Sequence, residues 1–279
     1  MNSKFKLAGS IEINRLGYGA MQLTGPGVFG DATDRTNAIK ILQTAIAESI
    51  NFIDTADSYG PHTNEVLIAD ALFPYKNLTV ATKGGFERSG PGQWLVNGNP
   101  DYIRDAIDGS LKRLRVEAID LWQLHRVDSR YPIEETLAPV AAAVKAGKIK
   151  HVGLSEVDVK QIEHAQKIVP IVSVQNMYNL ENRQWESVLD YTKSRGIAFI
   201  PWFPLASGPN GFGSHVHAIA KAHSASTAQI ALAWLLRHSE NILLIPGTKS
   251  IQHLRDNIRA VDITLTEEEF NTLSKLGPK

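Results

Sequence analysis

The sequence predicts an α/β protein, a single (β/α)8 TIM barrel preceded by an N-terminal β-hairpin. Short apolar runs rich in β-branched residues alternate with longer segments of helical periodicity along the 279 residues. Most of the short runs are apolar throughout, which is typical of parallel strands covered on both faces. No linker or low-complexity stretch interrupts this alternation, so residues 1–279 are expected to form one domain.

Eight candidate strands carry the apolar runs. They span residues 16–21, 51–54, 78–83, 118–125, 150–155, 171–175, 198–201 and 242–246. Ahead of them, residues 5–13 place Ala8-Gly9-Ser10 at a turn, which predicts a hairpin that plugs the barrel floor. An open doubly wound sheet is the alternative arrangement of the same pattern.

Helical periodicity occupies the intervals between the strands. The candidate helices span residues 33–49, 101–114, 133–146, 158–167, 185–194 and 226–237. Gly147 and Gly196 stand where two of these helices should end. A further helix over residues 266–276 begins with Thr266 and Glu269 at the spacing of a capping box.

Composition restricts the classes of function. The chain is 43% hydrophobic and 21% charged, as is ordinary for a globular protein, and its 29 Lys and Arg residues balance 29 Asp and Glu residues. This balance gives no reason to expect a nucleic acid or a membrane as partner. The absence of cysteine excludes disulfides and thiolate chemistry. The first residues contain no apolar leader segment, so a cytoplasmic monomer is expected.

Two familiar ligand sites are not predicted. A Rossmann dinucleotide site needs G-x-G-x-x-G after the first strand, and the chain has only Gly17-Tyr18-Gly19-Ala20 there. Any dinucleotide must therefore bind on a different fold. His215, His217 and His223 lack a carboxylate at ligand spacing, so they are interpreted as a solvated helix face and no metal is expected.

Four polar residues at neighbouring strand ends suggest chemistry. Active sites of parallel barrels gather at the carboxyl ends of the strands, where Asp54, Lys83 and His125 stand, with Tyr59 shortly after Asp54. Taken singly, Asp54 could be a helix cap, Lys83 a solvated rim charge, His125 a packing residue and Tyr59 a loop anchor. Together the four side chains suit carbonyl reduction. Tyr59 would donate the proton, the ammonium of Lys83 would lower the pKa of Tyr59, Asp54 would hold Lys83, and His125 would orient the substrate oxygen.

The motifs RLGYGAMQL, NFIDTADSYG, DLWQLH, GKIKHVGLS, VQNMYN, IPGTKS and LRDN, together with the lysine that closes the third strand, are similar to those of the aldo-keto reductase superfamily. The resemblance runs from Arg15 to about Ala260, and its catalytic tetrad falls on Asp54, Tyr59, Lys83 and His125. Within the superfamily, the chain looks most like bacterial pyridoxal reductase or pyridoxine 4-dehydrogenase members. The implied activity is reversible, NADPH-dependent reduction of an aldehyde or ketone, with pyridoxal or a small aromatic or aliphatic aldehyde as the expected substrate.

The resemblance also implies where NADP(H) would bind. The implied contacts are Gly19, Ala20, Met21, Asp54, Ser155, Gln175, Trp202, Leu205, Ser207, Gly247, Thr248, Lys249, Ser250, His253 and Asn257. Among these, Ser155 and Gln175 would bind the carboxamide, Trp202 would stack on the nicotinamide, and a helix starting at Ser250 would help to bind the 2′-phosphate. Lys249 and Arg255 favour NADP over NAD.

Two positions depart from the family pattern. Glu156 stands where Asn is usual, so the contacts to the nicotinamide are expected to differ, unless its side chain turns away. His253 stands where Arg is common, so the preference for NADP is expected to be weaker. The substrate loops are expected at residues 24–30, 87–98 and 126–131, with Trp94 and Trp122 as candidate wall residues.

Two other functions remain open at this stage. A Schiff-base lyase could use Lys83 as its nucleophile, although Asp54 would oppose the neutral amine that this requires. A non-catalytic barrel could instead bind NADP and report redox state to a partner, but the sequence shows no added segment that would supply an interaction surface.

Overall fold

The computed structural model describes residues 4–205 and 213–277. Seven parallel strands form its main sheet in the order β11-β10-β9-β8-β5-β4-β3. In chain order they are β3 (Tyr18–Gly19), β4 (Phe52–Asp54), β5 (Thr79–Gly84), β8 (Ile119–Leu124), β9 (Ile149–Ser155), β10 (Ile171–Gln175) and β11 (Ala198–Phe199). Strands of this sheet that follow one another in the chain are also neighbours in the sheet, as the predicted barrel requires.

The eighth candidate strand is only partly formed, yet it closes the barrel. Residues 242–246 make isolated parallel bridges on both sides, Phe199 with Ile242 and Leu16 with Leu244. The Gly17 amide donates to the Leu244 carbonyl at 2.7 Å, and the Leu244 amide donates to the Arg15 carbonyl at 2.8 Å. The first and last strands therefore meet, and the open doubly wound alternative is wrong.

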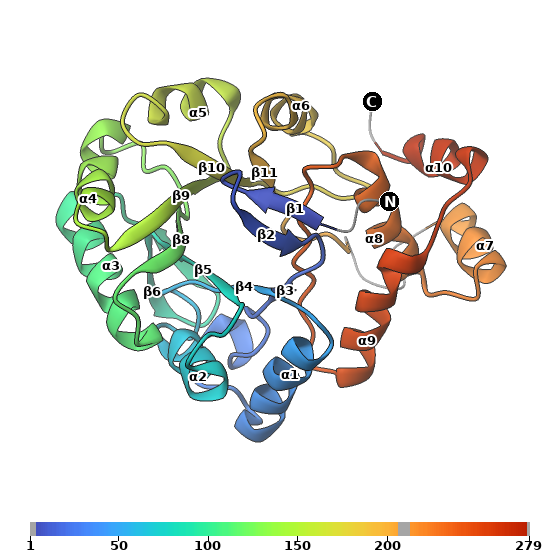
Figure 1. Ribbon diagram of the computed structural model, residues 1–279, viewed down its shortest axis with the longest axis horizontal. Coiled ribbons are helices and arrows are strands. Elements are labelled where there is room, and N and C mark those ends of the chain that lie inside the picture. Colours follow the sequence, from blue (N-terminus) through green and yellow to red (C-terminus); the bar gives the residue numbers. More distant parts are fainter. Residues whose placement is uncertain (1–3, 206–212, 278–279) are drawn as a thin grey trace.

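Helices surround this ring of strands (Figure 1). The outer layer comprises α1 (Arg35–Ala47), α2 (Thr63–Leu72), α3 (Pro100–Leu114), α4 (Ile133–Lys145), α5 (Val159–Ala165), α6 (Glu186–Ser194), α7 (Ser214–Ala222), α8 (Thr227–His238), α9 (Ile251–Arg259) and α10 (Glu267–Ser274), with short 3-10 turns at Pro26–Val28 and Ala260–Asp262. The predicted capping box of Thr266 and Glu269 at the start of α10 is confirmed. The candidate helices did not include α2, and of α9 only the start was expected. Helix α7 was expected only as the solvated face that carries His215, His217 and His223; His215 and His217 are exposed on it, whereas His223 caps its end and pairs with Glu269.

The N-terminal hairpin closes one end of the barrel, as predicted. Strands β1 (Lys4–Leu7) and β2 (Ile11–Asn14) pair antiparallel, and Figure 1 shows them across the centre of the ring. Leu7 and Ile13 are fully buried in a cluster with residues that include Leu121 and Leu243. The hairpin therefore fills the barrel interior from its floor.

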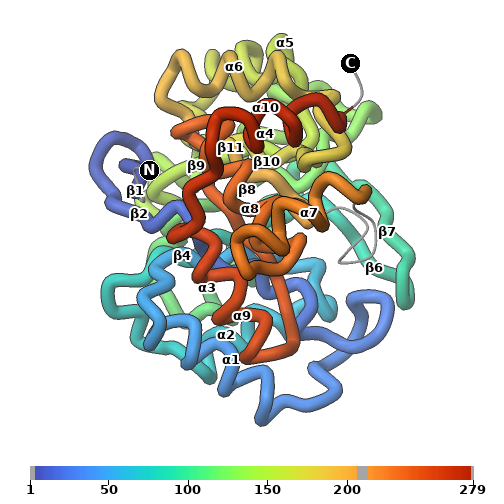
Figure 2. The backbone as a smooth tube through the Cα atoms, turned by 90° about the vertical axis from the view of Figure 1, so that its right-hand side faces the viewer, coloured from blue at the N-terminus to red at the C-terminus, as the bar shows by residue number. Residues whose placement is uncertain are grey.

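A second hairpin lies at the opposite end of the barrel from the first (Figure 2). Strands β6 (Phe86–Gly90) and β7 (Gln93–Val96) pair antiparallel within the segment expected to be a substrate loop. The turn at Pro91-Gly92, where Gly92 has φ of 70°, is the sequence signal that could have predicted it. The mouth of the barrel is therefore bordered by an ordered hairpin. None of the described helices is long and apolar enough to cross a membrane.

Candidate active site

The structure brings the four predicted catalytic residues together at the mouth. Asp54 is the last residue of β4, Lys83 is the penultimate residue of β5, and His125 directly follows β8. Tyr59 lies in the loop after β4. All four are buried, and Lys83 is fully enclosed. Parallel strands bring their carboxyl ends to one edge of the barrel, and for this reason residues distant in sequence meet here.

Lys83 is the centre of the group. Its Nζ lies 2.5 Å from Asp54 Oδ1, donates to the Thr55 carbonyl at 2.8 Å, and lies 3.5 Å from Tyr59 Oη. Three hydrogen-bond partners satisfy the three donors of an ammonium, which a buried lysine needs in order to stay charged. The geometry therefore matches the expectation that Asp54 holds Lys83 against Tyr59.

The pKa values follow from burial and from this ion pair. Burial lowers the pKa of Lys83, but Asp54 and Tyr59 raise it more, so the net pKa of the ammonium lies above its usual range. A raised pKa opposes the neutral amine that a Schiff-base lyase would need. Burial raises the pKa of Tyr59, and although Lys83 lowers it, the net direction is upward. Lys83 therefore lowers the pKa of Tyr59 as expected, but desolvation of the phenolate outweighs the ammonium, so the net pKa does not fall below its usual value.

The second carboxylate oxygen of Asp54 is held by two amides. Gln175 and Gln123 donate to Asp54 Oδ2 at 3.0 and 3.2 Å. Gln123 was not predicted, although its alternation with Leu121 and His125 along β8 places all three on one face of the strand. These contacts fix the carboxylate from the side opposite Lys83, and they occupy the amide nitrogen of Gln175.

His125 is neutral and set among aromatic rings. Burial lowers its pKa well below the usual value, and the charges of Lys83 and Arg126 act in the same direction. Its Nδ1 lies 3.4 Å from Ser58 Oγ. The ring centroids of Phe86 and Tyr59 lie 4.7 and 5.9 Å away. A neutral imidazole keeps one N–H donor, which suits a group that orients a substrate oxygen.

The two tryptophans expected to form the wall have different positions. Trp94 on β7 lies edge-on to Tyr59, Phe86 and His125, with centroid distances of 6.3, 5.3 and 6.3 Å, and is 38% exposed. Trp122 is fully buried in the outer core between the strands and the helices. A Cβ on Gly84 would lie 2.8 Å from the Trp122 ring, so glycine makes room for it. Of the two interpretations open for Trp122, a wall residue or core packing, the structure shows core packing, because strand alternation turns it away from Gln123 and the barrel interior.

The expected nicotinamide contacts are linked to one another. Ser155 Oγ, at the end of β9, donates to the Gln175 carbonyl at 2.7 Å. Glu156 adopts a left-handed backbone (φ 55°), and its Oε1 accepts from the Met177 amide at 2.5 Å and from Trp202 Nε1 at 2.6 Å. Glu156 therefore anchors Trp202, which gives this departure from the family pattern a structural role.

The first and last strands approach closely at the mouth. Gly19 and Gly247 face each other, and a Cβ on either would lie 2.5–2.6 Å from a carbonyl oxygen of the opposite segment. Ala20 is buried beside them and Met21 is exposed. Tyr18 Oη donates to the carbonyl of Thr248 at 2.7 Å, which ties the two segments together.

The expected phosphate site lies at the start of α9. Ser250 is the N-cap, and its side chain accepts from the His253 amide at 3.3 Å, so the predicted helix start is confirmed. Asn257 is buried within the helix, whereas Lys249 and His253 are exposed. Arg255 pairs with Glu48 at 3.0 Å. Leu205 is the last described residue before the gap, and Ser207 lies outside the described residues.

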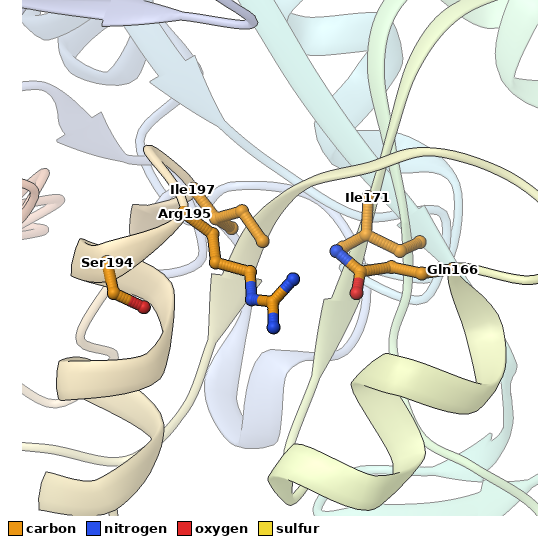
Figure 3. Close-up of a pocket in the computed structure, with 5 residues that line it drawn as sticks. All are labelled: Gln166, Ile171, Ser194, Arg195 and Ile197. Carbon is orange, nitrogen blue, oxygen red and sulfur yellow. The ribbon is translucent and has the colours of Figure 1, made fainter.

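Two further observations concern a metal site and the opposite end of the barrel. No group of three or more His, Cys, Asp or Glu residues in residues 4–205 and 213–277 could hold a metal ion. An open depression of about 540 Å³ lies at the floor end, where Ile171 begins β10 and Ile197 precedes β11. Gln166 and Arg195 extend into it from the ends of α5 and α6 (Figure 3). It is remote from Tyr59, since it borders the amino ends of the strands.

A parallel eight-stranded barrel with its ionisable side chains at the carboxyl ends of the strands defines a barrel enzyme. The aldo/keto reductase family model matches residues 15–209 and 213–278, and the chain belongs to this family of oxidoreductases.

Two relatives in sequence support this assignment, and a solved structure has the same fold. The chain is 42% identical to pyridoxine 4-dehydrogenase of Escherichia coli over 284 residues, which cover 99% of both chains. It is 47% identical to an uncharacterized oxidoreductase of Schizosaccharomyces pombe over 270 residues, 96% of this chain and 88% of the other. An aldo/keto reductase from Klebsiella pneumoniae, solved with NADP and acetate, has the same fold with a TM-score of 0.84 at 23% identity, covering 100% of this chain and 97% of that one.

Proposed function

We propose that the chain catalyses reversible, NADP(H)-dependent reduction of an aldehyde or ketone to the alcohol, with Tyr59 as the proton donor. One observation carries the proposal. The fully buried ammonium of Lys83 lies 2.5 Å from Asp54 and 3.5 Å from Tyr59 Oη, at the open end of the barrel. No other described group of residues combines a proton donor with a buried cation at this end.

The chain's own residues would perform the proton chemistry. NADPH, when bound, supplies the hydride that carbon receives. Tyr59 keeps its proton at neutral pH because burial raises its pKa, so it can donate that proton to the carbonyl oxygen. Lys83 then stabilises the phenolate that remains, and the neutral His125 orients the oxygen by donating a hydrogen bond. Asp54 keeps Lys83 charged and in place.

The residues present fit the cofactor. The first N–H groups of a helix have no partner within the helix, so the start of α9 offers donors to a phosphate. Lys249 and His253 flank these donors at the surface and add positive charge or further donors. Trp202 is held by Glu156 beside Ser155, where it can cover a flat ring. We therefore assign the nicotinamide to Ser155, Gln175 and Trp202.

Pyridoxal is the proposed substrate, with other small aromatic or aliphatic aldehydes as alternatives. Two observations support it. The relative that is 42% identical over its full length is named pyridoxine 4-dehydrogenase. Phe86 and Trp94 also form an aromatic wall next to Tyr59 and His125, which suits a planar ring. We further propose that the protein works in the cytoplasm as a monomer of one domain.

The test measures NADPH consumption with pyridoxal and simple aldehydes in wild type, Tyr59→Phe and Tyr191→Phe. Tyr191 is the matched control because its hydroxyl donates to Gln166 near the barrel floor, at 3.1 Å, away from the mouth. We expect Tyr59→Phe to lose about 10²–10⁴-fold in kcat while still binding NADPH, and Tyr191→Phe to match wild type. Full activity in Tyr59→Phe would refute the assignment of the proton donor.

A further inference from the structure

Arg126 lies at the mouth, directly after His125, and the proton chemistry does not use it. Its guanidinium carbon lies 5.4 Å from the ring centroid of Phe86 and 5.8 Å from that of Trp202. The side chain therefore lies between the β6–β7 hairpin on one side and the proposed nicotinamide site on the other. It is half-buried, so its charge is partly removed from water.

Only part of the hydrogen-bonding capacity of Arg126 is used. Nη1 donates to the His125 carbonyl at 2.6 Å and to Ser155 Oγ at 3.0 Å. Nη2 and Nε donate to none of the residues that the structure describes, and no carboxylate among these residues lies within ion-pair distance of the guanidinium. Glu156, whose charge acts on Arg126, already uses Oε1 for Met177 and Trp202. Arg126 thus keeps three N–H donors and a charge without a carboxylate partner.

Arg88, another arginine at the mouth, uses its donors differently. Arg88 stacks on Trp94, with its guanidinium carbon 3.6 Å from the ring centroid. Its nitrogens donate to main-chain carbonyls on three segments: Gln93 at 2.8 Å, Val28 at 2.9 Å, Ser58 at 3.0 Å and Gly27 at 2.7 Å. Arg88 therefore fastens the hairpin to the neighbouring loops, whereas Arg126 retains donors for a ligand.

We propose that Arg126 determines specificity by binding an acidic oxygen of the substrate, a carboxylate or a phenolate, while the carbonyl lies at Tyr59 and His125. A guanidinium binds such oxygens with two parallel charge-assisted hydrogen bonds, and the free Nη2 and Nε are the pair that can do so. The inference rests on the proposed function and narrows it: the preferred substrates are aldehydes that carry an anionic oxygen on the same molecule.

The experiment compares matched aldehydes in wild type, Arg126→Met and Arg126→Lys. The pair 4-carboxybenzaldehyde and 4-methylbenzaldehyde tests a carboxylate, and the pair pyridoxal and pyridine-4-carbaldehyde tests a phenolate. We expect Arg126→Met to lower kcat/KM for the acidic member of at least one pair about 10- to 100-fold, mainly through KM, with little change for the neutral member. Arg126→Lys should recover part of the loss, because lysine keeps the positive charge but lacks the two parallel N–H donors of the guanidinium. The pair that responds identifies the kind of oxygen.

Arg195→Met is the control, since this arginine lies at the floor depression (Figure 3). It should leave the ratio of kcat/KM between the acidic and the neutral aldehyde unchanged in both pairs. The Kd of NADPH, measured by quenching of tryptophan fluorescence, separates the remaining outcomes. Equal losses for acidic and neutral aldehydes together with weaker NADPH binding would overturn the inference and make Arg126 a cofactor contact. Unchanged ratios with active reduction of neutral aldehydes would overturn it while sparing the proposed function. Wild type that reduces no aldehyde at all would overturn both.

Discussion

Asp57 is a buried acid two residues before Tyr59. It is 1% exposed, and its Oδ1 has no hydrogen-bond partner among the described residues. Its Oδ2 lies 3.5 Å from Tyr102 Oη, but the single proton of that hydroxyl goes to the Phe86 carbonyl at 2.7 Å. A hydrogen bond between Asp57 and Tyr102 therefore needs a protonated Asp57, whose carboxyl group donates to Tyr102 Oη. This agrees with a pKa of about 8 for Asp57, which burial and then Glu65 raise.

Asp57→Asn should change how stability depends on pH. The folded pKa of about 8 exceeds the usual value of 3.8, so the contribution of Asp57 is fully present below the unfolded pKa and is lost as pH rises to about 8. Within this window the free energy of unfolding falls by up to about 1.4 kcal/mol for each pH unit. Asparagine resembles the protonated acid and can donate to Tyr102 Oη. We expect the variant to lose less stability than wild type between about pH 5 and pH 8.

Urea denaturation across this pH range measures the effect. Asp101→Asn is the control, because Asp101 is exposed at the start of α3. Parallel pH dependence in wild type and Asp57→Asn would show that Asp57 is ionised in the folded protein.

Three elements are joined by a buried ion pair. Glu65 on α2 is enclosed, and its Oε2 lies 2.6 Å from Arg113 Nε on α3. Its other oxygen accepts from Thr82 Oγ1 on β5 at 2.6 Å. Removing the cation alone leaves an uncompensated buried carboxylate, and this costs more than replacing both partners.

Arg113→Met should therefore destabilise the protein by about 3–5 kcal/mol. The double variant Glu65→Gln/Arg113→Met should recover part of that loss, because glutamine removes the charge and still accepts from Thr82. Arg104→Met, which breaks the exposed pair with Asp101, is expected to cost at most about 1 kcal/mol. Free energies of unfolding would test the three variants together. A double variant no more stable than Arg113→Met would contradict an electrostatic origin.

In the whole molecule, one buried side chain links the two segments that close the barrel. Arg15 is 2% exposed, and its guanidinium donates to the carbonyls of Leu236 at 2.9 Å and Ile242 at 3.0 Å, and to that of Ser239. These carbonyls belong to the end of α8 and to the chain that leads into the last barrel segment. Arg15 thus fastens the first strand region to the last, a link between residues more than 220 positions apart in the sequence.

Arg15→Met should weaken this closure, since it leaves three buried carbonyls without this donor. We expect a loss of about 3 kcal/mol or more in the free energy of unfolding. Amide hydrogen exchange at Gly17 and Leu244, whose bonds join the first and last segments, should accelerate more than exchange in β8. Arg259→Met, at an exposed arginine, is the control. Unchanged exchange at Gly17 and Leu244 would mean that the strand bonds close the barrel without Arg15.

The amino-acid sequence was enough to predict the architecture and the four residues at the mouth of the barrel. Apolar runs specify strands buried on both faces, and short helical connections between them leave few topologies other than a parallel barrel. Once the strands were placed, their carboxyl ends had to meet, so Asp54, Lys83 and His125 could be predicted as neighbours. The family motifs gave the same residues and extended them to the cofactor.

Features that depend on packing and on contacts between distant segments could not be predicted and are visible only in the folded molecule. The tertiary structure placed Trp122 in the outer core, turned the Glu156 side chain onto Trp202, and left two nitrogens of Arg126 without a partner among the described residues. It also decided the net direction of the Tyr59 pKa, which burial raises more than Lys83 lowers it, because desolvation depends on all the surrounding atoms and not on one neighbouring charge. Periodicity reports which face of an element is buried, whereas the partner of each polar atom is set by three-dimensional contact.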